Sequence, residues 1–143
     1  MFEKLNQIVK ESDQAFLASG LGVTAKNDAM CEASGVIVDV LKSQLDNGKA
    51  NDLMSYFKAN QMAYQGLTGL MVNKYAHRLN SYFNLSIAEA KDLSEQIIPL
   101  VMRKFVAQTM GNNKETNGLF NLMNWLSGNT VNFETFFLKL NVA

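Results

Sequence analysis

The chain has 143 residues, of which 48% are apolar and 18% charged, a composition that fits one globular domain. Thirteen lysines and arginines balance thirteen acidic residues, so a dedicated nucleic-acid binder is not expected. The chain has one cysteine, which excludes an internal disulfide framework and every multi-cysteine zinc module.

No apolar stretch is long enough to cross a bilayer. The longest strongly apolar run, Ile97–Met102, is far shorter than the roughly 20 residues that a spanning helix needs. Glu3 and Asn6 interrupt the N-terminus where a signal peptide requires an apolar core. We therefore expect a cytoplasmic protein without a membrane span, with export after removal of a leader as the alternative.

Apolar residues recur at helical spacing along most of the chain, and no pair of alternating strands joined by a hairpin turn is present. The pattern predicts an all-α single domain covering residues 1–143, a bundle of about seven helices packed without a sheet. The predicted helical segments are 1–19, 24–46, 51–57, 67–83, 86–110, 119–126 and 133–140.

Three sequence features predict where the two longest helices begin and where one of them bends. Thr24 is an expected N-cap for the helix that ends before Asn47-Gly48. Ser86 and Glu89 have the spacing of a capping box, in which each side chain bonds the other residue's backbone N–H. Pro99 lies inside an unbroken apolar pattern, so we expect a kinked long helix there.

The two halves of the chain resemble each other. Leu21–Thr24 align with Phe83–Ser86, and Asn51–Met54 align with Asn117–Phe120. These matches favour an internal duplication of residues 21–83 and 84–143, each half carrying a long, a short and a medium helix. The alternative is chance similarity between amphipathic helices.

One segment also resembles a known family. Leu85–Ala90, followed by Ile97–Leu100, resembles the turn and the mid-helix proline of YidB-like domains. Val36–Phe57, with its Asn-Gly stop, fits the same pattern, and the resemblance covers roughly residues 21–105. The resemblance implies a bacterial helical domain of unknown function. Because the family has no assigned activity, the resemblance identifies no catalytic residue in this chain. The chain departs from the family in lacking its usual glycine-rich stretches.

Candidate catalytic groups are few. Cys31 and His77 are the sole thiol and imidazole, and we expect Cys31 to be a small buried hydrophobe instead of a nucleophile. One cysteine and one histidine also leave a transition-metal site without a suitable ligand set. The prediction is therefore a protein that is not an enzyme and that has no cofactor and no metal.

Lys74, His77 and Arg78 are neighbours on one face of a predicted helix that has no acidic residue. This basic face could bind an anion or an acidic partner, and a solvated helix face is the alternative. It is the one local charge asymmetry that the sequence indicates.

The last third of the chain is rich in methionine and aromatic residues. Such residues fill loose cores and also line apolar binding surfaces. The candidate apolar partner surface comprises Met123, Trp125, Phe133, Phe136 and Phe137, with core filling as the alternative.

Together these features predict a non-enzymatic helical module that binds a protein partner or a second copy of itself. The alternative is a binder of a small apolar ligand, such as an acyl chain, held between helices near Pro99. In that case Lys74, His77 or Arg78 would meet an acidic headgroup.

Overall fold

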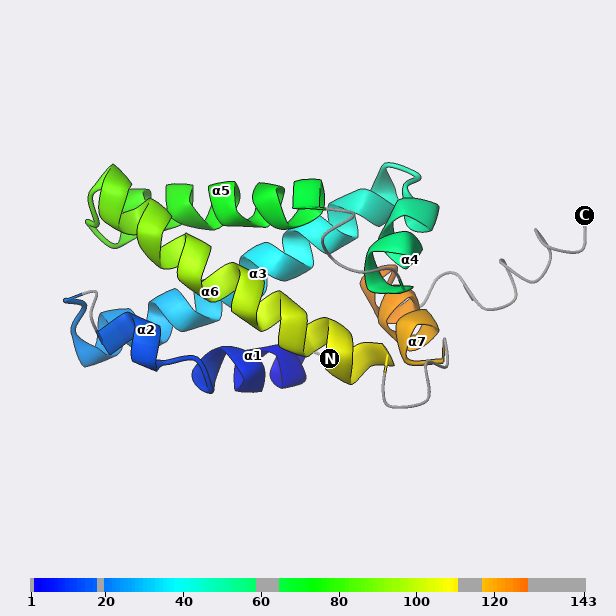
Figure 1. Ribbon diagram of the computed structural model, residues 1–143, viewed down its shortest axis with the longest axis horizontal. Helices are drawn as coiled ribbons and strands as arrows, with labels where there is room; N and C mark the ends of the chain where they lie inside the picture. The colour runs from blue at the N-terminus through cyan, green and yellow to red at the C-terminus, as the bar shows by residue number, and fades with distance from the viewer. Residues whose placement is uncertain (1, 18–19, 59–64, 111–116, 129–143) are drawn as a thin grey trace, which may run out of the picture.

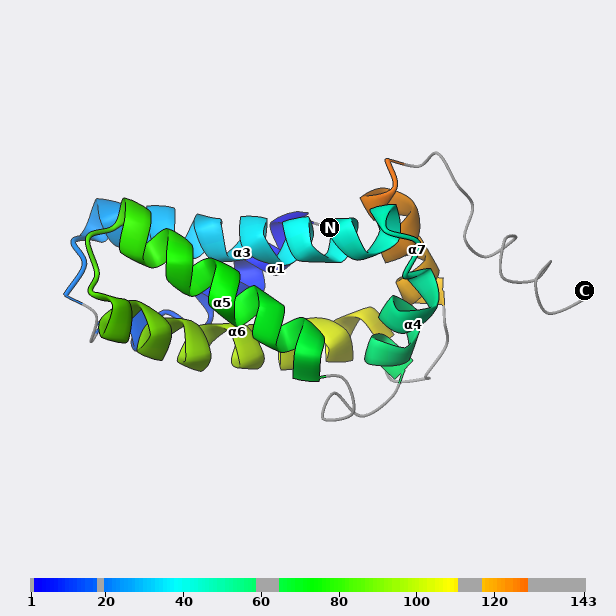
Figure 2. The ribbon, with the colours of Figure 1, turned by 90° about the horizontal axis from the view of Figure 1, so that it is seen from above.

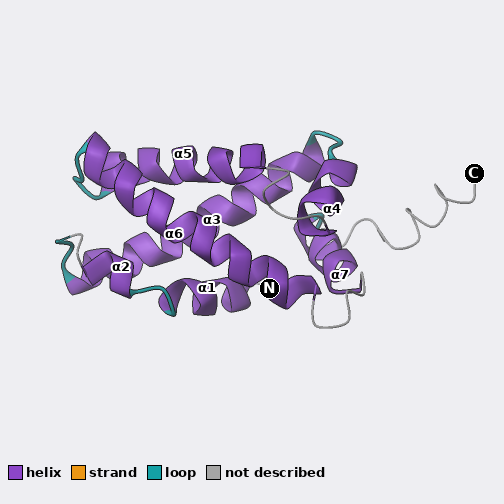
Figure 3. Cartoon of the chain, in the orientation of Figure 1, coloured by secondary structure: helices purple, strands orange, loops and turns teal. Residues whose placement is uncertain are grey.

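A computed structural model describes residues 2–17, 20–58, 65–110 and 117–128, and across these ranges the regular structure is entirely helical (Figure 3). The predicted all-α, single-domain bundle is confirmed. The helices are α1 Phe2–Lys10, α2 Gln14–Leu17, α3 Val23–Asp46, α4 Ala50–Lys58, α5 Gln65–Tyr82, α6 Ile87–Met110 and α7 Asn117–Leu126. None of them combines the length and apolar content that a bilayer-spanning helix needs.

Three long helices form the body of the molecule. In Figure 1, α6 passes in front of α3, with α5 on one side and α1 on the other, and Figure 2 shows α3 and α6 separated in depth. Helix α5 packs most extensively against α6, and α1 contacts both α3 and α6. The short helices α4 and α7 lie at one end of the body, and α2 lies near the other end (Figures 1 and 2).

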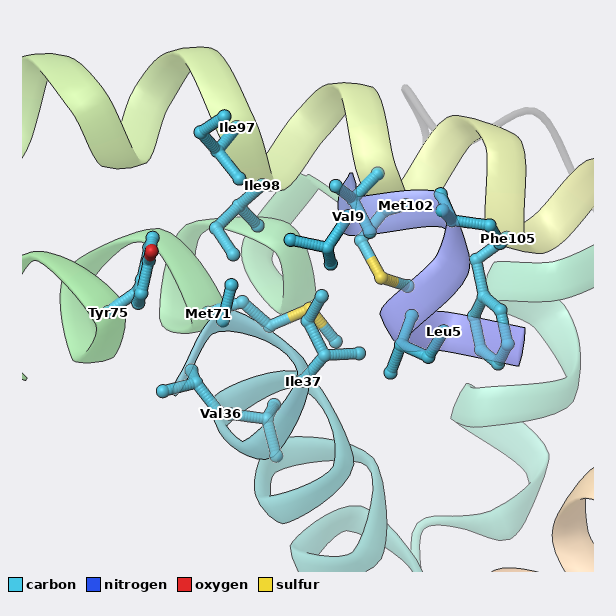
Figure 4. Close-up of a cluster of buried hydrophobic side chains, with 14 of the residues drawn as sticks. Leu5, Val9, Val36, Ile37, Met71, Tyr75, Ile97, Ile98, Met102 and Phe105 are labelled. Carbon is cyan, nitrogen blue, oxygen red and sulfur yellow. The ribbon is translucent and has the colours of Figure 1, made fainter. Parts of the chain in front are cut away.

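The core lies where these four helices meet. Figure 4 shows side chains from α1, α3, α5 and α6 converging in one apolar cluster. The cluster forms because each helix has apolar residues at three- and four-residue spacing, which places them on one face. Its labelled members are Leu5, Val9, Val36, Ile37, Met71, Tyr75, Ile97, Ile98, Met102 and Phe105.

The first predicted helix, residues 1–19, is wrong in one respect, because the chain bends between α1 and α2. The Ser12 amide donates to the Val9 carbonyl at 3.0 Å, a tighter turn than an α-helix makes. The Ser12 hydroxyl also bonds the Ile8 carbonyl. Serine and aspartate side chains compete in this way with regular helix bonds. The last predicted helix, 133–140, lies outside the described residues.

Helix α6 begins as predicted. The Glu89 amide donates to the Ser86 hydroxyl at 3.1 Å, and the Ser86 amide donates to a Glu89 carboxylate oxygen at 3.4 Å. The reciprocal bonds of a capping box are therefore confirmed. The helix then continues through Pro99 without a break, with Ile98 and Val101 fully buried beside it.

Helix α3 begins differently from the prediction. Its N-cap is Gly22, whose backbone is extended and whose carbonyl accepts a bond from the Lys26 amide at 2.7 Å. No side chain caps this end. The predicted cap at Thr24 is wrong because the chain is already helical from Val23, so the Thr24 hydroxyl is inside the first turn.

Buried polar groups link the long helices to one another. The Tyr75 hydroxyl on α5 donates to the Ala29 carbonyl of α3 at 2.7 Å. The Ser94 hydroxyl on α6 donates to the Val72 carbonyl of α5 at 2.6 Å. Because buried donors are costly to leave unpaired, these bonds favour one register of α5 against its two neighbours.

Candidate interaction groove

A groove runs between α3 and α5. In Figure 2, α5 crosses obliquely over the space between α3 and α6, and its N-terminal end lies away from α3, toward the end that carries α4. Two adjoining depressions, of about 470 Å³ and about 380 Å³, occupy this region and share Gln44 and Leu70. We refer to them together as the α3–α5 groove. It is lined by Val40, Ser43, Gln44, Lys49, Asp52, Tyr56, Gly66, Leu67, Leu70, Asn73, Lys74 and His77.

The groove has an apolar centre and a polar rim. Leu70 is 53% exposed, although its helix neighbour Met71 is fully buried in the core. Val40 is almost completely buried beneath the groove. The amides of Gln44 and Asn73 contribute hydrogen-bonding groups to the same depression. An apolar centre with a few polar groups around it is the usual composition of a binding site.

A network of ion pairs joins α3 to α5 beside the groove. The Arg78 guanidinium donates to the Glu32 carboxylate and, at 3.0 Å, to the Asp39 carboxylate. The Lys74 ammonium lies 3.9 Å from the same Asp39 carboxylate. The two acids come from α3, so the tertiary structure places negative charge against the basic face of α5.

This network affects the ionisation of two side chains. Burial disfavours the charge on Arg78, but the hydrogen bonds and negative charges of Glu32 and Asp39 outweigh burial and raise the pKa of Arg78. Burial also raises the pKa of Tyr75 far above its ordinary value, and the negative charge of Glu32 raises it further. Arg78 therefore stays charged and bonded to the two acids of α3. Tyr75 stays neutral and donates its hydroxyl proton to the Ala29 carbonyl.

The predicted basic face is thus divided in the structure. Arg78 is partly buried within the ion-pair network, whereas Lys74 and His77 are exposed and line the groove. The sequence pattern identified these residues but not their acidic partners, because Glu32 and Asp39 are far away along the chain. Lys74 and His77 are the members of the face that an incoming ligand can reach.

The predicted apolar partner surface is only partly described. Met123 has no exposed surface and belongs to the core, so its assignment to a surface is corrected. It is buried because α7 packs against both α3 and α6. Trp125 is partly buried and packs against the core. Phe133, Phe136 and Phe137 lie outside the described residues.

Cys31 is exposed, so the expectation of a buried cysteine is wrong. The buried stripe of α3 contains Met30, Ala33 and Ile37, and Cys31 projects from another face of the helix. Within the described ranges, no cluster of three or more histidine, cysteine or acidic residues is arranged to hold a metal ion.

Sequence reasoning missed the groove itself. Leu70 belongs to the same apolar pattern as the partly buried Leu67 and the fully buried Met71, so periodicity assigned it to the core. Leu70 lies about 100° around the helix from Met71, and only the packing of α5 against α3 decides whether that position is covered. One sequence signal was available. The polar residues Asn73 and Lys74 lie three and four positions after Leu70, so they mark the edge of the apolar face of α5.

No family model matches the chain, and neither the curated proteins nor the solved structures contain a match to it.

Proposed function

We propose that the chain is a non-enzymatic helical interaction module whose α3–α5 groove binds an amphipathic helix. The observation that carries the proposal is Leu70, a large apolar side chain that is 53% exposed and lines both depressions beside α3. Helix-in-groove recognition uses such a surface, with apolar anchors of the ligand helix inserted into it.

The dimensions of the groove support this mode of binding. The two depressions follow consecutive turns of α5, from Gly66 near its start to His77. A ligand helix can place side chains about one turn apart into adjoining depressions, which suits anchors at i, i+3, i+4 and i+7. The rim formed by Gln44, Asn73 and Lys74 would bond polar groups that flank those anchors.

The alternative, a small apolar ligand held between helices near Pro99, has less support. Ile97, Ile98, Val101 and Met102 around that position are fully buried in the core cluster. One depression is lined by α3 and α5 and the other by α3, α4 and α5, and neither is lined by a residue of α6. The bacterial origin that the resemblance to YidB-like domains implies, and the cytoplasmic location expected from the sequence, remain part of the proposal.

Selection of displayed amphipathic peptides against the full-length protein tests the proposal. We expect enriched peptides to carry large apolar residues at i, i+3, i+4 and i+7 and to bind reversibly. Leu70→Glu should weaken their binding by at least about tenfold, because a carboxylate would be buried against the peptide's apolar face.

Ile87→Glu is the matched control. Ile87 is 77% exposed at the start of α6, outside the groove, so the same change there should leave peptide affinity unaltered. If Leu70→Glu and Ile87→Glu bound the selected peptides equally well, or if no peptide were enriched, the groove would not be the binding surface.

A further inference from the structure

We infer that the helix bound in the α3–α5 groove is acidic, with a carboxylate one helical turn from its apolar anchor, bonded by Lys74 and His77. This inference rests on the proposed function, because it names the chemistry of the partner for the same groove. Apolar anchors alone would admit a ligand helix of either charge, and the polar groups of the groove select between them.

The larger depression of the groove holds hydrogen-bond donors and no carboxylate. Its lining residues are Val40, Ser43, Gln44, Leu70, Asn73, Lys74 and His77. Lys74 and His77 are three positions apart on α5, so they lie on one face of that helix. An ammonium only donates hydrogen bonds, an imidazole, a hydroxyl and an amide can donate, and an ionised carboxylate only accepts. The depression is therefore complementary to a carboxylate above an apolar floor.

The ion pairs beside the groove leave the donors of Lys74 open. Asp39 accepts a hydrogen bond from the Arg78 guanidinium at 3.0 Å, whereas the Lys74 ammonium lies 3.9 Å from the same carboxylate oxygen. The longer separation is beyond hydrogen-bond distance, so this contact uses none of the three N–H donors of Lys74. Lys74 and His77 are both exposed. A carboxylate that enters the groove can thus accept a bond from Lys74 while Arg78 holds Asp39.

The smaller depression determines which end of the groove takes the acid. Its charged lining residues are Lys49 and Asp52, which have opposite signs. An acidic side chain bound there would be repelled by Asp52, so the end of the groove at Lys74 is favoured. Leu70 lies one turn before Lys74 on α5, about 6 Å along the helix axis. A ligand helix lying along the groove therefore carries its acid three or four positions from the residue that contacts Leu70.

A basic ligand helix fits this surface less well. Among the residues that line the two depressions, Asp52 alone is acidic, and it lies beside Lys49. A lysine or arginine of the ligand at the other end would face Lys74 without a lining carboxylate to accept its bonds. Like charges brought together at an interface lower the affinity, so the groove discriminates against basic helices.

A double-mutant cycle between the protein and a bound peptide tests the inference. Helical peptides that depend on Leu70 would carry either Glu or Gln at each position three or four residues from the anchor. At one of these positions we expect Glu to bind the parent about fivefold more tightly than Gln, and Lys to bind more weakly than Gln. With Lys74→Met, which keeps most of the aliphatic stem, the preference for Glu over Gln should fall below about twofold.

Lys91→Met is the matched control. Lys91 is exposed on α6, outside the groove, so this variant should keep the full preference for Glu. In 1 M NaCl the preference should shrink in the parent, because salt screens the pair between the peptide carboxylate and Lys74. Exchanging Glu for Gln in the peptide cannot unfold the protein, so the measurement on the parent is independent of any loss of stability.

The outcomes separate this inference from the proposed function. Equal affinities of the Glu and Gln peptides at every position, with dependence on Leu70 retained, would overturn the acidic partner and leave the groove's function intact. A preference for Glu that persists in Lys74→Met would place the carboxylate elsewhere and overturn its assignment to Lys74. Tighter binding of the Lys peptides would show a basic partner and overturn the inference. Peptides that bind independently of Leu70 would overturn the proposed function itself.

Discussion

At the residue scale, Ser86 is the clearest case of a side chain with a single local task. Its hydroxyl accepts the Glu89 amide bond at the start of α6. We expect Ser86→Ala to lower the free energy of unfolding by about 0.5–2 kcal/mol, because that amide loses its partner. Ser86→Asp should be nearly neutral, and Ser86→Gly should cost only a few tenths of a kcal/mol. Urea unfolding curves measure all three.

Thr24 provides the matched control for Ser86. It is exposed within the first turn of α3, where Gly22 is the N-cap and no side chain bonds the end of the helix. Thr24→Ala should therefore change stability by no more than a few tenths of a kcal/mol, since alanine also has the higher helix propensity. A loss as large as that of Ser86→Ala would mean that Thr24 caps α3 in solution.

Tyr75 predicts a loss of stability at alkaline pH. Its pKa is raised in the folded protein by burial and by the negative charge of Glu32, whereas in the unfolded chain it is near 10.0. Above that pH the unfolded state loses its proton first, so stability is intact below pH 10 and falls as the pH rises. The slope contributed by one tyrosine approaches about 1.4 kcal/mol per pH unit.

Tyr75→Phe tests this assignment by urea unfolding between pH 8 and pH 11. At pH 8 the variant should be about 1 kcal/mol less stable, because the hydrogen bond to the Ala29 carbonyl is lost. Its stability should fall less steeply above pH 10 than that of the parent. Tyr56, whose pKa burial also raises against the opposing hydrogen bond to Thr68, accounts for part of the remaining slope. Equal slopes in parent and variant would contradict the role of Tyr75.

At the element scale, ion pairs between α3 and α5 form only when the two helices pack together. Arg78 bonds Glu32 and Asp39 from a partly buried position. We expect Arg78→Met to cost about 1 kcal/mol at low ionic strength, a modest value because the pairs are partly exposed to water. The difference from the parent should shrink in 1 M NaCl, where screening weakens the pairs.

Arg103→Met, at an exposed position on α6, is the control for Arg78→Met. It should change stability by less than about 0.5 kcal/mol, as is usual for a surface substitution. If the two variants lost equal stability, the network would add nothing to the docking of α5 on α3.

The lengths of α3 and α6 can be compared with the expected internal duplication. Helices α3 and α6 each have 24 residues, and each is followed by a short helix of nine or ten residues. This order agrees with the first two helices of each expected half. The duplication stays a prediction, since residues 133–140, the expected third helix of the second half, lie outside the described residues.

At the scale of the whole molecule, stability should be distributed unevenly. Helix α5 packs against both α3 and α6, and these three helices contribute most of the core, whereas α4 and α7 pack at one end. We expect hydrogen exchange to be slowest in the middle of these three helices and faster in α4 and α7, because the end helices can open without exposing the whole core. Protection of α7 equal to that of α6 would show that the bundle opens only as one unit.

The sequence by itself determined the fold class, most helix boundaries and the capping box at Ser86. These features depend on neighbours within a few residues: apolar spacing defines a helix face, and a hydroxyl three residues before a glutamate can satisfy both end amides. Continuation of α6 through Pro99 was predictable for the same reason, since the apolar stripe persists on both sides of it.

Only the tertiary structure decided the site. Leu70 and Met71 both fit the apolar pattern of α5, but Met71 faces the core, whereas Leu70, about 100° around the helix, stays half exposed beside α3. The acidic partners of Arg78 come from another helix, so charge patterning within α5 could not reveal them. Exposure and pairing depend on how whole helices cross, and that angle is set by the packing of many side chains together, which no short stretch of sequence specifies.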